Sequence, residues 1–321
     1  MTKIAWERLR ALLGMCERAL AQWDEPASPV RRTAAELARP SPPAPTSYRP
    51  LQRVAMHEDV LRLLFEEYEE HRRTERGEEE TGWILLGRRD VDQATVMATL
   101  PAGANRDAGE AHVQFDSTVQ VVASRIVRQK DRRLVLLGIV HTHPGSLRHP
   151  SDGDYRGDIE WISQLRGEEG IFGIGTADGK FADGTAALRQ PRPNLQALQQ
   201  LSFAWYSLKR GDRNYVPIPI EVIAGPDLAA PLRSVWKAIE SHAPRLERLA
   251  RQQAKVQFDI VDGALLEVIV PLAESSNAVR VLLSEKEVKY YLVRDGVLAA
   301  DLYEPCVDRG VYRLLAELAG D

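Results

Sequence analysis

Cysteine is scarce in this sequence, and long apolar runs are missing. Cys16 and Cys306 are the only cysteines among its 321 residues, which excludes a disulfide framework or a cysteine-rich zinc ribbon and fits a reducing cytoplasm. No run of about 18 apolar residues occurs, the length that a membrane-spanning helix needs. Charged residues interrupt the first ten positions, unlike the apolar region of a signal peptide. We therefore expect a soluble, cytoplasmic protein with no membrane association.

The sequence also has no excess of basic residues. Its 42 Lys and Arg residues against 46 Asp and Glu residues give a formal net charge of -4, so it lacks the positive field that a nucleic-acid backbone requires. The apolar fraction of 44% and the charged fraction of 27% are those of an ordinary globular protein. The length exceeds that of one typical domain. We expect a globular protein that does not bind nucleic acid and has one main domain with additions.

Three segments differ in composition. Residues 1–50 combine a predicted amphipathic helix over 3–23 with a proline-rich linker, and the helix carries apolar side chains at steps of three and four: Trp6, Leu9, Leu13, Cys16, Leu20 and Trp23. Residues 51–225 alternate strand-like and helix-like runs, which predicts an α/β domain with a mixed sheet. Residues 226–321 follow Gly225-Pro226 and predict an α+β extension with a helix around Trp236, four strands after residue 263 and a closing helix.

Within the main domain, the patterns predict a helix from about residue 60 and strands at 81–87, 94–100 and 112–115. A helix at 117–132 and a buried strand at 134–140 follow. A helix over 151–165, a strand at 171–176 and a hairpin over 202–223 complete the predicted unit.

The end of the strand at 134–140 carries the residues that point to chemistry. His141 and His143 are two positions apart, and the period of a strand places both imidazoles on the same side. Pro144 and the next residues turn the chain back to Ser151 and Asp154, at the start of a predicted helix. Two histidines and one aspartate leave a fourth position open, which is the pattern of catalytic zinc with a bound water. Such a site also needs a carboxylate that accepts a proton from the water.

This pattern resembles that of the JAMM metallopeptidases, also called the JAB, MPN or Mov34 family. Their motif is an upstream Glu, then His-Ser/Thr-His-Pro, six residues, Ser, two residues and Asp. The matching positions here are Glu80, His141, Thr142, His143, Pro144, Ser151 and Asp154. The segment from Glu80 to Gly87, Glu-Thr-Gly-Trp-Ile-Leu-Leu-Gly, is similar to the strand that carries the family's glutamate.

The resemblance implies a cytidine-deaminase-like core and one Zn²⁺ per chain, held by His141, His143 and Asp154. It implies that Glu80 is the base and that Ser151 donates a hydrogen bond to the oxyanion. The implied activity is zinc-dependent cleavage after the C-terminal tail of a ubiquitin-like protein, as in the bacterial deconjugating branch. The implied partners are that modifier or its conjugates, with E1- and E2-like enzymes as further candidates.

Several alternatives stay open at this stage. Ser151 and Asp154 also fit a helix capping box, and Glu80 belongs to a run of three glutamates that could be a solvated face. His149 lies between the ligands and could bind a second metal, but a loop histidine near a cleft is more often solvent-exposed or substrate-facing. Trp83 stands where the family has a small residue, which bears on how a substrate tail lies along that strand. A binding scaffold, or a peptidase that trims a sulfur-carrier protein, would use the same fold.

Overall fold

The structure, a computed structural model, describes residues 47–104, 106–109, 112–182, 184–272, 277–293, 297–300 and 302–320. The amphipathic helix and most of the proline-rich linker predicted for residues 1–50 lie outside the described residues. By their contacts, the described residues form two compact units: a first unit of residues 47–117 and 133–230, and a second unit of residues 118–132 and 231–320. None of the described helices is long and apolar enough to span a bilayer.

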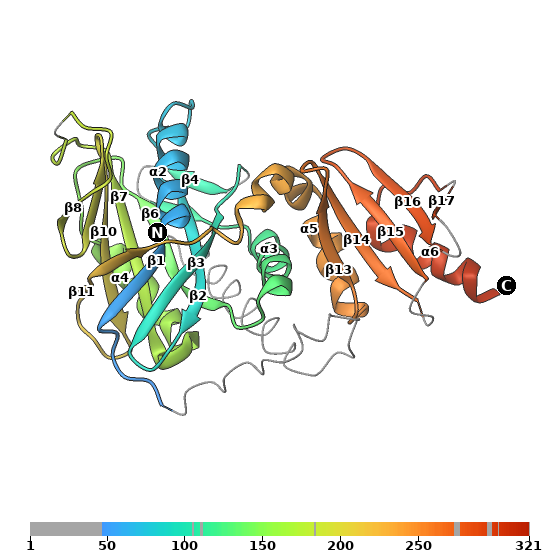
Figure 1. The fold of residues 1–321 in the computed structure, drawn as a ribbon, viewed down its shortest axis with the longest axis horizontal. Helices are drawn as coiled ribbons and strands as arrows, with labels where there is room; N and C mark the ends of the chain where they lie inside the picture. Colours follow the sequence, from blue (N-terminus) through green and yellow to red (C-terminus); the bar gives the residue numbers. More distant parts are fainter. Residues whose placement is uncertain are drawn as a thin grey trace. The chain divides into compact units, whose positions relative to one another are not determined.

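A ten-stranded mixed sheet dominates the described part of the first unit (Figure 1). Its strands run in the order β12-β1-β3-β2-β6-β7-β10-β9-β8, and β11 pairs with β10 alone. The bounds are β1 (Arg53–His57), β2 (Gly82–Arg89), β3 (Gln93–Pro101), β6 (Val135–Thr142), β7 (Glu169–Thr176), β8 (Arg189–Arg192), β9 (Leu195–Leu198), β10 (Leu201–Lys209), β11 (Val216–Pro217) and β12 (Ile220–Ile223). The strands β4 (Asp107–Gly109) and β5 (His112–Gln114) form a separate hairpin.

Two helices of the first unit matter most for the site. The helix α2 (Glu58–Arg72) packs beside β1, β3 and β12, and α4 (Asp152–Trp161) packs beside β10. Two 3₁₀ turns, Ile162–Gln164 and Arg166–Glu168, follow α4, and a third, Ala230–Val235, begins at the end of the first unit. The expected α/β class, with a mixed sheet and flanking helices, is therefore confirmed.

The main hydrophobic core lies on the face of the sheet that α2 covers. Phe65 of α2 meets Phe203 of β10 edge to face, with ring centroids 5.0 Å apart. Trp83, Val140 and Trp205 belong to the same cluster. Since side chains alternate along a strand, the neighbours of these residues face the opposite side of the sheet. The candidate site residues lie on that opposite side.

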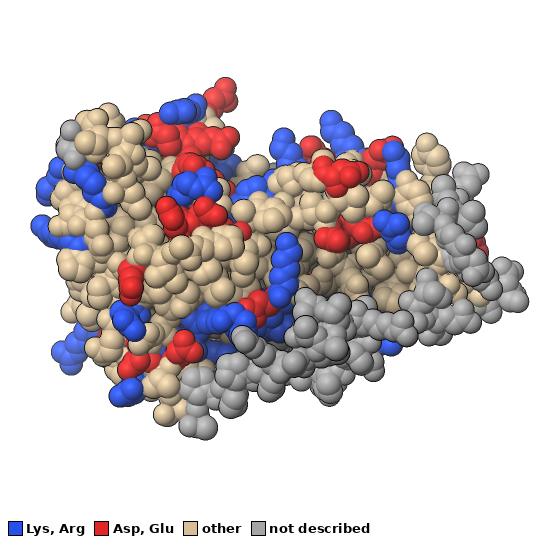
Figure 2. Space-filling view, viewed as in Figure 1, with Lys and Arg blue, Asp and Glu red and all other residues tan. Residues whose placement is uncertain are grey.

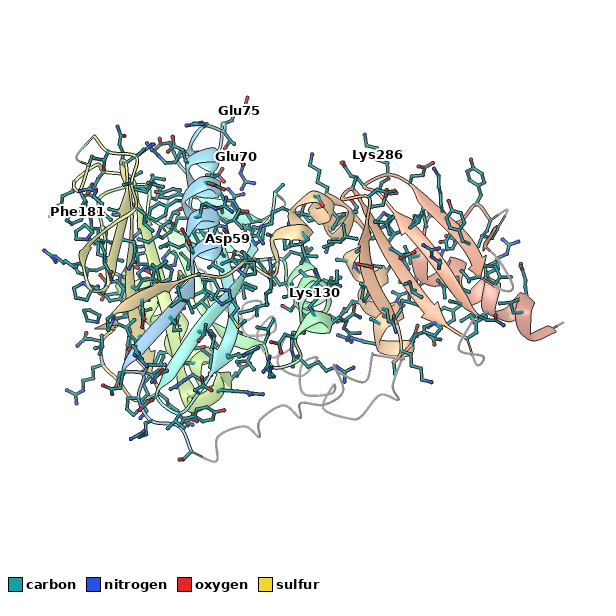
Figure 3. The ribbon with its side chains drawn as sticks, viewed as in Figure 1. Asp59, Glu70, Glu75, Lys130, Phe181 and Lys286 are labelled. Carbon is teal, nitrogen blue, oxygen red and sulfur yellow. The ribbon has the colours of Figure 1, made fainter. Side chains whose placement is uncertain are left out.

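Charged side chains are interspersed over the face shown in Figure 2, and acidic ones gather over α2. Asp59, Glu70 and Glu75 lie in and just after this helix and are labelled in Figure 3. Several of the acids pair with arginines within the same turn or two, as Glu66 does with Arg62 at 2.8 Å. This face is therefore a solvated, ion-paired helix surface.

The predicted hairpin over 202–223 is only partly right. In β10 and β11 only two residue pairs form, Tyr206 with Pro217 and Ser207 with Val216. After β11, the next strand, β12, does not pair with β10 but pairs in parallel with β1 at the opposite edge of the sheet. The sequence patterns also missed β1, β8, β9 and β13 (Gln257–Val261), because each has only four or five residues and shows too short an alternation to be recognised.

The second unit contains a five-stranded antiparallel sheet in the order β13-β14-β15-β16-β17. Its further strands are β14 (Leu265–Pro271), β15 (Ala278–Leu283), β16 (Val288–Val293) and β17 (Val297–Ala299), and its helices are α3 (Ser117–Lys130), α5 (Trp236–Gln252) and α6 (Val307–Gly320). The predicted α+β extension thus has one more strand than expected. The helix α3 groups with this unit although it lies inside the predicted 51–225 domain, and Gln129 bonds the backbone of Val256 and Phe258. The predicted domain boundaries stay predictions.

Candidate metal centre

The strand β6 carries His141 near its end and is buried between β2 and β7. The pairing is close because Gly138 faces Ile171 of β7, where a Cβ atom would lie 1.8 Å from the carbonyl oxygen. His141 pairs with Ile174 of β7 and with Gly82 of β2. Its imidazole is therefore on the side of Ile174, away from the α2 core.

A seven-residue loop, 144–150, leads from His143 to the first turn of α4. Ser151 is the N-cap of this helix and forms a capping box with Asp154. The Asp154 amide donates to the Ser151 hydroxyl oxygen at 3.2 Å, and the Ser151 amide donates to Asp154 Oδ2 at 2.6 Å. The capping interpretation of these two residues is thus confirmed. Asp154 Oδ1 takes no part in the box.

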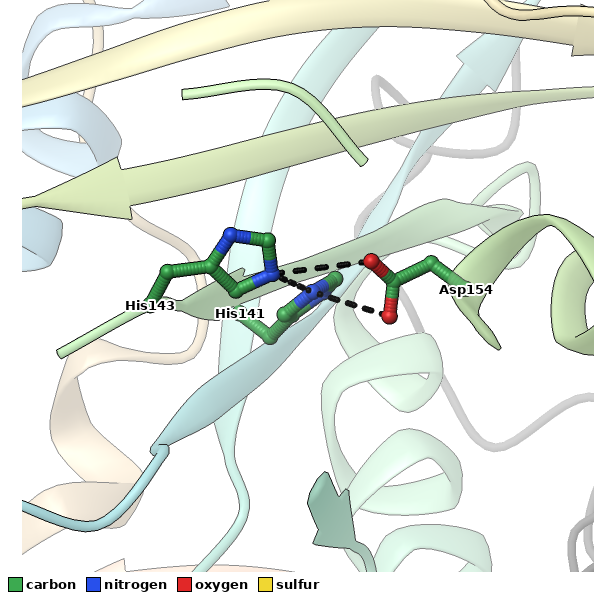
Figure 4. A group of neighbouring side chains, drawn as sticks. All are labelled: His141, His143 and Asp154. Carbon is green, nitrogen blue, oxygen red and sulfur yellow. Dashed lines mark hydrogen bonds and ion pairs between the residues drawn. The ribbon is translucent and has the colours of Figure 1, made fainter. Parts of the chain in front are cut away.

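His141, His143 and Asp154 converge on one point (Figure 4). The two Nε2 atoms are 3.0 Å apart, and they lie 3.4 Å from Asp154 Oδ1 and 3.5 Å from Asp154 Oδ2, respectively. Burial by itself lowers the pKa of His141, but the Asp154 carboxylate outweighs it and raises this pKa to about 9. Although burial opposes ionisation of Asp154, the two histidines hold its pKa well below the usual range. The Asp154 carboxylate therefore favours a positive charge at this cluster of three side chains.

A backbone hydrogen bond fixes the tautomer of His143. Its Nδ1 lies 2.8 Å from the carbonyl oxygen of Leu147, and a carbonyl only accepts, so Nδ1 carries the proton. In the neutral ring the lone pair is then on Nε2, which faces His141. A ligating histidine in a metal site has this same arrangement, with its second nitrogen bonded to a carbonyl or carboxylate.

The spacing of the three groups fits a zinc ion. Ligands at about 2.0–2.2 Å in tetrahedral geometry are separated by roughly 3.3 Å. The two Nε2 atoms are 3.0 Å apart and His141 Nε2 lies 3.4 Å from Asp154 Oδ1. One ligand atom from each residue gives a set in which all atoms lie within 4.8 Å of one another. Two imidazole nitrogens and a carboxylate oxygen are also the donor types that zinc prefers. His141, His143 and Asp154 could therefore hold zinc.

Glu80 lies on the same face of the sheet as the histidines. Two hydrogen bonds of 2.9 Å join Thr81 and Thr142: the Thr142 amide donates to the Thr81 carbonyl, and the Thr81 amide donates to the Thr142 hydroxyl oxygen. Gly82 pairs with His141, and since side chains alternate along a strand, Glu80 lies on the same side as His141. Its side chain is 5% exposed, and burial raises its pKa. Glu78 is exposed and Glu79 pairs with Arg76, which distinguishes Glu80 from the rest of the glutamate run.

The backbone of Glu80 is held from two sides. Its amide donates to Gly109 of the β4–β5 hairpin at 2.8 Å, and its carbonyl accepts from Arg106 Nε at 3.3 Å. His71 Nε2 donates to the carbonyl of Glu79 at 2.9 Å, so His71 Nδ1 is free to accept from Arg106 Nη2 at 3.3 Å. These bonds fix the direction in which the Glu80 side chain leaves the chain.

Trp83, which departs from the family pattern, is buried in the core on the α2 side, where its Nε1 donates to Glu67 at 2.5 Å. The Trp83 side chain therefore does not occupy the face of β2 on which the histidines lie. His149 is exposed and its Nδ1 lies 2.7 Å from the Tyr206 hydroxyl, and it is not among the grouped ligands.

Sequence reasoning missed two residues near the site. Asp158 is one helical turn after Asp154, is buried, and accepts hydrogen bonds from Tyr215 and Trp161 at 2.7 and 3.2 Å. Burial raises its pKa to about 7. The other is Tyr206, a tyrosine within the buried strand β10. A buried hydroxyl needs a partner, and this is a signal that the sequence did contain.

Comparison with known proteins agrees with the motif. Residues 63–179 match a family described as prokaryotic homologs of the JAB domain, which is consistent with a JAB (MPN) assignment of this segment. The matched segment includes all five candidate site residues. A solution structure of a protein from Desulfitobacterium hafniense is similar, with 17% identity and a TM-score of 0.34, over 54% of this chain and 94% of that one. No curated protein matches the chain.

Proposed function

We propose that this chain is a zinc-dependent peptidase or isopeptidase that cleaves after the C-terminal tail of a ubiquitin-like protein. The observation that most supports this proposal is that the three candidate metal ligands and Glu80 lie on the same face of the sheet. Three ligand atoms lie within 4.8 Å of one another, and a buried carboxylate, Glu80, accompanies them on that face. A scaffold would not need a buried glutamate beside two histidines.

Each of the five candidate site residues has a separate role in the proposed reaction. His141, His143 and Asp154 would hold the metal, and zinc in such a site polarises a carbonyl group and makes water acidic. Glu80 would accept a proton from the attacking water and return it to the leaving amine, and its raised pKa suits both directions. The Ser151 hydroxyl accepts one bond from Asp154, which leaves its hydrogen to stabilise the carbonyl oxygen as negative charge develops there.

The substrate is proposed from the match to the JAB family and not from a pocket. We propose a bacterial ubiquitin-like modifier or its conjugates, with E1- and E2-like enzymes as partners and the cytoplasm as the location. The second unit would contribute to docking of the modifier or of such an enzyme. A peptidase that trims a sulfur-carrier protein is a second candidate, since it would use the same five residues.

The test compares two glutamates in the same run. The substrates are bacterial ubiquitin-like proteins that carry either a C-terminal peptide extension or an isopeptide-linked lysine peptide. Glu80→Gln should keep zinc and the folded state but lose cleavage by at least about 10²-fold, because a general base contributes that much. Glu78→Gln is the matched control, since Glu78 is exposed, and it should cleave like the wild type. Equal activity of Glu80→Gln and the wild type would remove Glu80 from the mechanism.

Preference between the two substrate types separates the candidate functions. Cleavage of the isopeptide-linked form indicates deconjugation, whereas cleavage of the linear extension alone indicates precursor trimming. If zinc binds and no substrate in the panel is cleaved, while the Glu80→Gln variant behaves identically, the scaffold explanation is favoured.

A further inference from the structure

The loop 144–150 connects the two halves of the candidate metal centre. It follows His143 and ends at Ser151, the N-cap of the helix that carries Asp154. Three successive residues of this loop are held by hydrogen bonds. Leu147 offers its carbonyl to His143 Nδ1 at 2.8 Å, and the next two residues, Arg148 and His149, both bond to a single side chain.

That side chain is Tyr206 of β10, two strands away from β6 in the sheet. It is 4% exposed and packs in a small cluster with Ile174, Leu195 and Ala204. Its hydroxyl donates to the Arg148 carbonyl at 2.8 Å and lies 2.7 Å from His149 Nδ1. Since the hydroxyl has one hydrogen, His149 Nδ1 is the donor of the second bond. Burial raises the pKa of Tyr206 to about 12, so the hydroxyl keeps its hydrogen at neutral pH.

The side chain of Arg148 holds the same part of the loop from outside. It forms an ion pair with Asp178 and lies over the ring of Phe181, 5.1 Å from the centroid. Phe181 is labelled in Figure 3 and packs against the cluster that contains Tyr206. The loop is therefore attached to the sheet through both the backbone and the side chain of Arg148.

We infer that Tyr206 is a positioning residue for the metal centre, acting through the Arg148 carbonyl. Because Leu147 and Arg148 are adjacent, fixing one carbonyl fixes the direction of the other, and the Leu147 carbonyl orients the His143 ring. The same anchor sets where the chain enters α4, and hence where Asp154 lies. This inference rests on the proposed zinc-dependent function.

The test is Tyr206→Phe, which removes the hydroxyl and keeps the ring. Partners one step removed from metal ligands change metal affinity or activity by about 10–100-fold, and Tyr206 is a further step away. We expect zinc affinity, measured by competition with a chromogenic chelator, to fall by about 5–10-fold. We expect turnover to fall by a similar factor, with KM changed less than kcat because Tyr206 is buried beneath the loop.

Tyr290→Phe in the second unit is the matched control. Tyr290 is equally buried, and its hydroxyl also donates to a backbone carbonyl, that of Glu304, at 2.8 Å. Both variants should lose similar thermal stability, and only Tyr206→Phe should lose zinc affinity. A second variant, His149→Ala, removes the hydrogen bond between His149 and the Tyr206 hydroxyl but keeps the bond from that hydroxyl to the Arg148 carbonyl. Its zinc affinity should be within about twofold of that of the wild type.

The outcomes separate the inference from the proposed function. If the wild type binds zinc and cleaves substrate while Tyr206→Phe matches it in both, the positioning role is wrong and the function stands. Zinc loss in Tyr290→Phe equal to that in Tyr206→Phe would also overturn the role, since the effect would then be general destabilisation. A wild-type chain that takes up no zinc overturns both.

Discussion

Ser151 has two possible tasks, and their magnitudes differ enough to separate them. As an N-cap, its hydroxyl oxygen accepts a hydrogen bond from the Asp154 amide at 3.2 Å. Replacement of such a cap by alanine costs about 1 kcal/mol of stability. An ordinary domain is stable by about 5–15 kcal/mol, so Ser151→Ala would stay more than about 99% folded at 25 °C. Loss of the cap alone therefore leaves turnover unchanged.

As an oxyanion donor, the same hydroxyl would matter far more. Removal of one such donor lowers kcat by about 10²–10³-fold. We expect Ser151→Ala to unfold a few degrees earlier, to retain zinc, and to lose turnover by about 10²-fold or more. Ser151→Thr keeps a hydroxyl and a capping oxygen and should preserve most of both properties.

The assay combines thermal unfolding, zinc content and cleavage of a modifier fusion at 25 °C, well below the unfolding transition. If Ser151→Ala were less stable but turned over substrate at the wild-type rate, Ser151 would be a helix cap only.

Two further predictions concern stability. Asp227 is buried and accepts hydrogen bonds from Thr99 Oγ1 at 2.6 Å and from the Ala229 amide at 2.7 Å. Asp227→Ala should lower the free energy of unfolding, measured with denaturant, by roughly 2–4 kcal/mol because these donors lose their acceptor. A decrease under about 0.5 kcal/mol would show that water replaces the carboxylate. At Gly310 a Cβ atom would lie 2.2 Å from the Tyr290 ring. Gly310→Ala should therefore destabilise the folded state by about 1–3 kcal/mol through overpacking. An unchanged melting temperature would contradict this, because it would mean that the ring moves without cost.

The sequence predicts the core of the site because each part depends on local periodicity. The period of a strand places His141 and His143 on one side, and a capping pattern places Ser151 and Asp154 in the first turn of a helix. The position of Glu80 followed from the resemblance, and the structure shows its physical basis in the pairing of Thr81 with Thr142.

Features that depend on distant pairing were not predictable in the same way. The parallel pairing of β12 with β1 joins Ile220 to Val54, and no local pattern in either short strand indicates its partner. The anchoring of the site loop by Tyr206 likewise depends on which strands are neighbours in the sheet. The grouping of α3 with the second unit follows from side chains such as Gln129, whose partners lie more than 120 residues away.

Zinc binding by the full chain tests the central claim most directly. Metal analysis and chelator competition should find one tightly bound zinc per wild-type chain, and none in His141→Ala or Asp154→Ala, because each change removes one of three protein ligands. His149→Ala is the matched control and should retain the metal, since His149 bonds Tyr206 instead. A wild-type chain that takes up no zinc, or a His141→Ala chain that binds it as tightly as the wild type, would contradict the account.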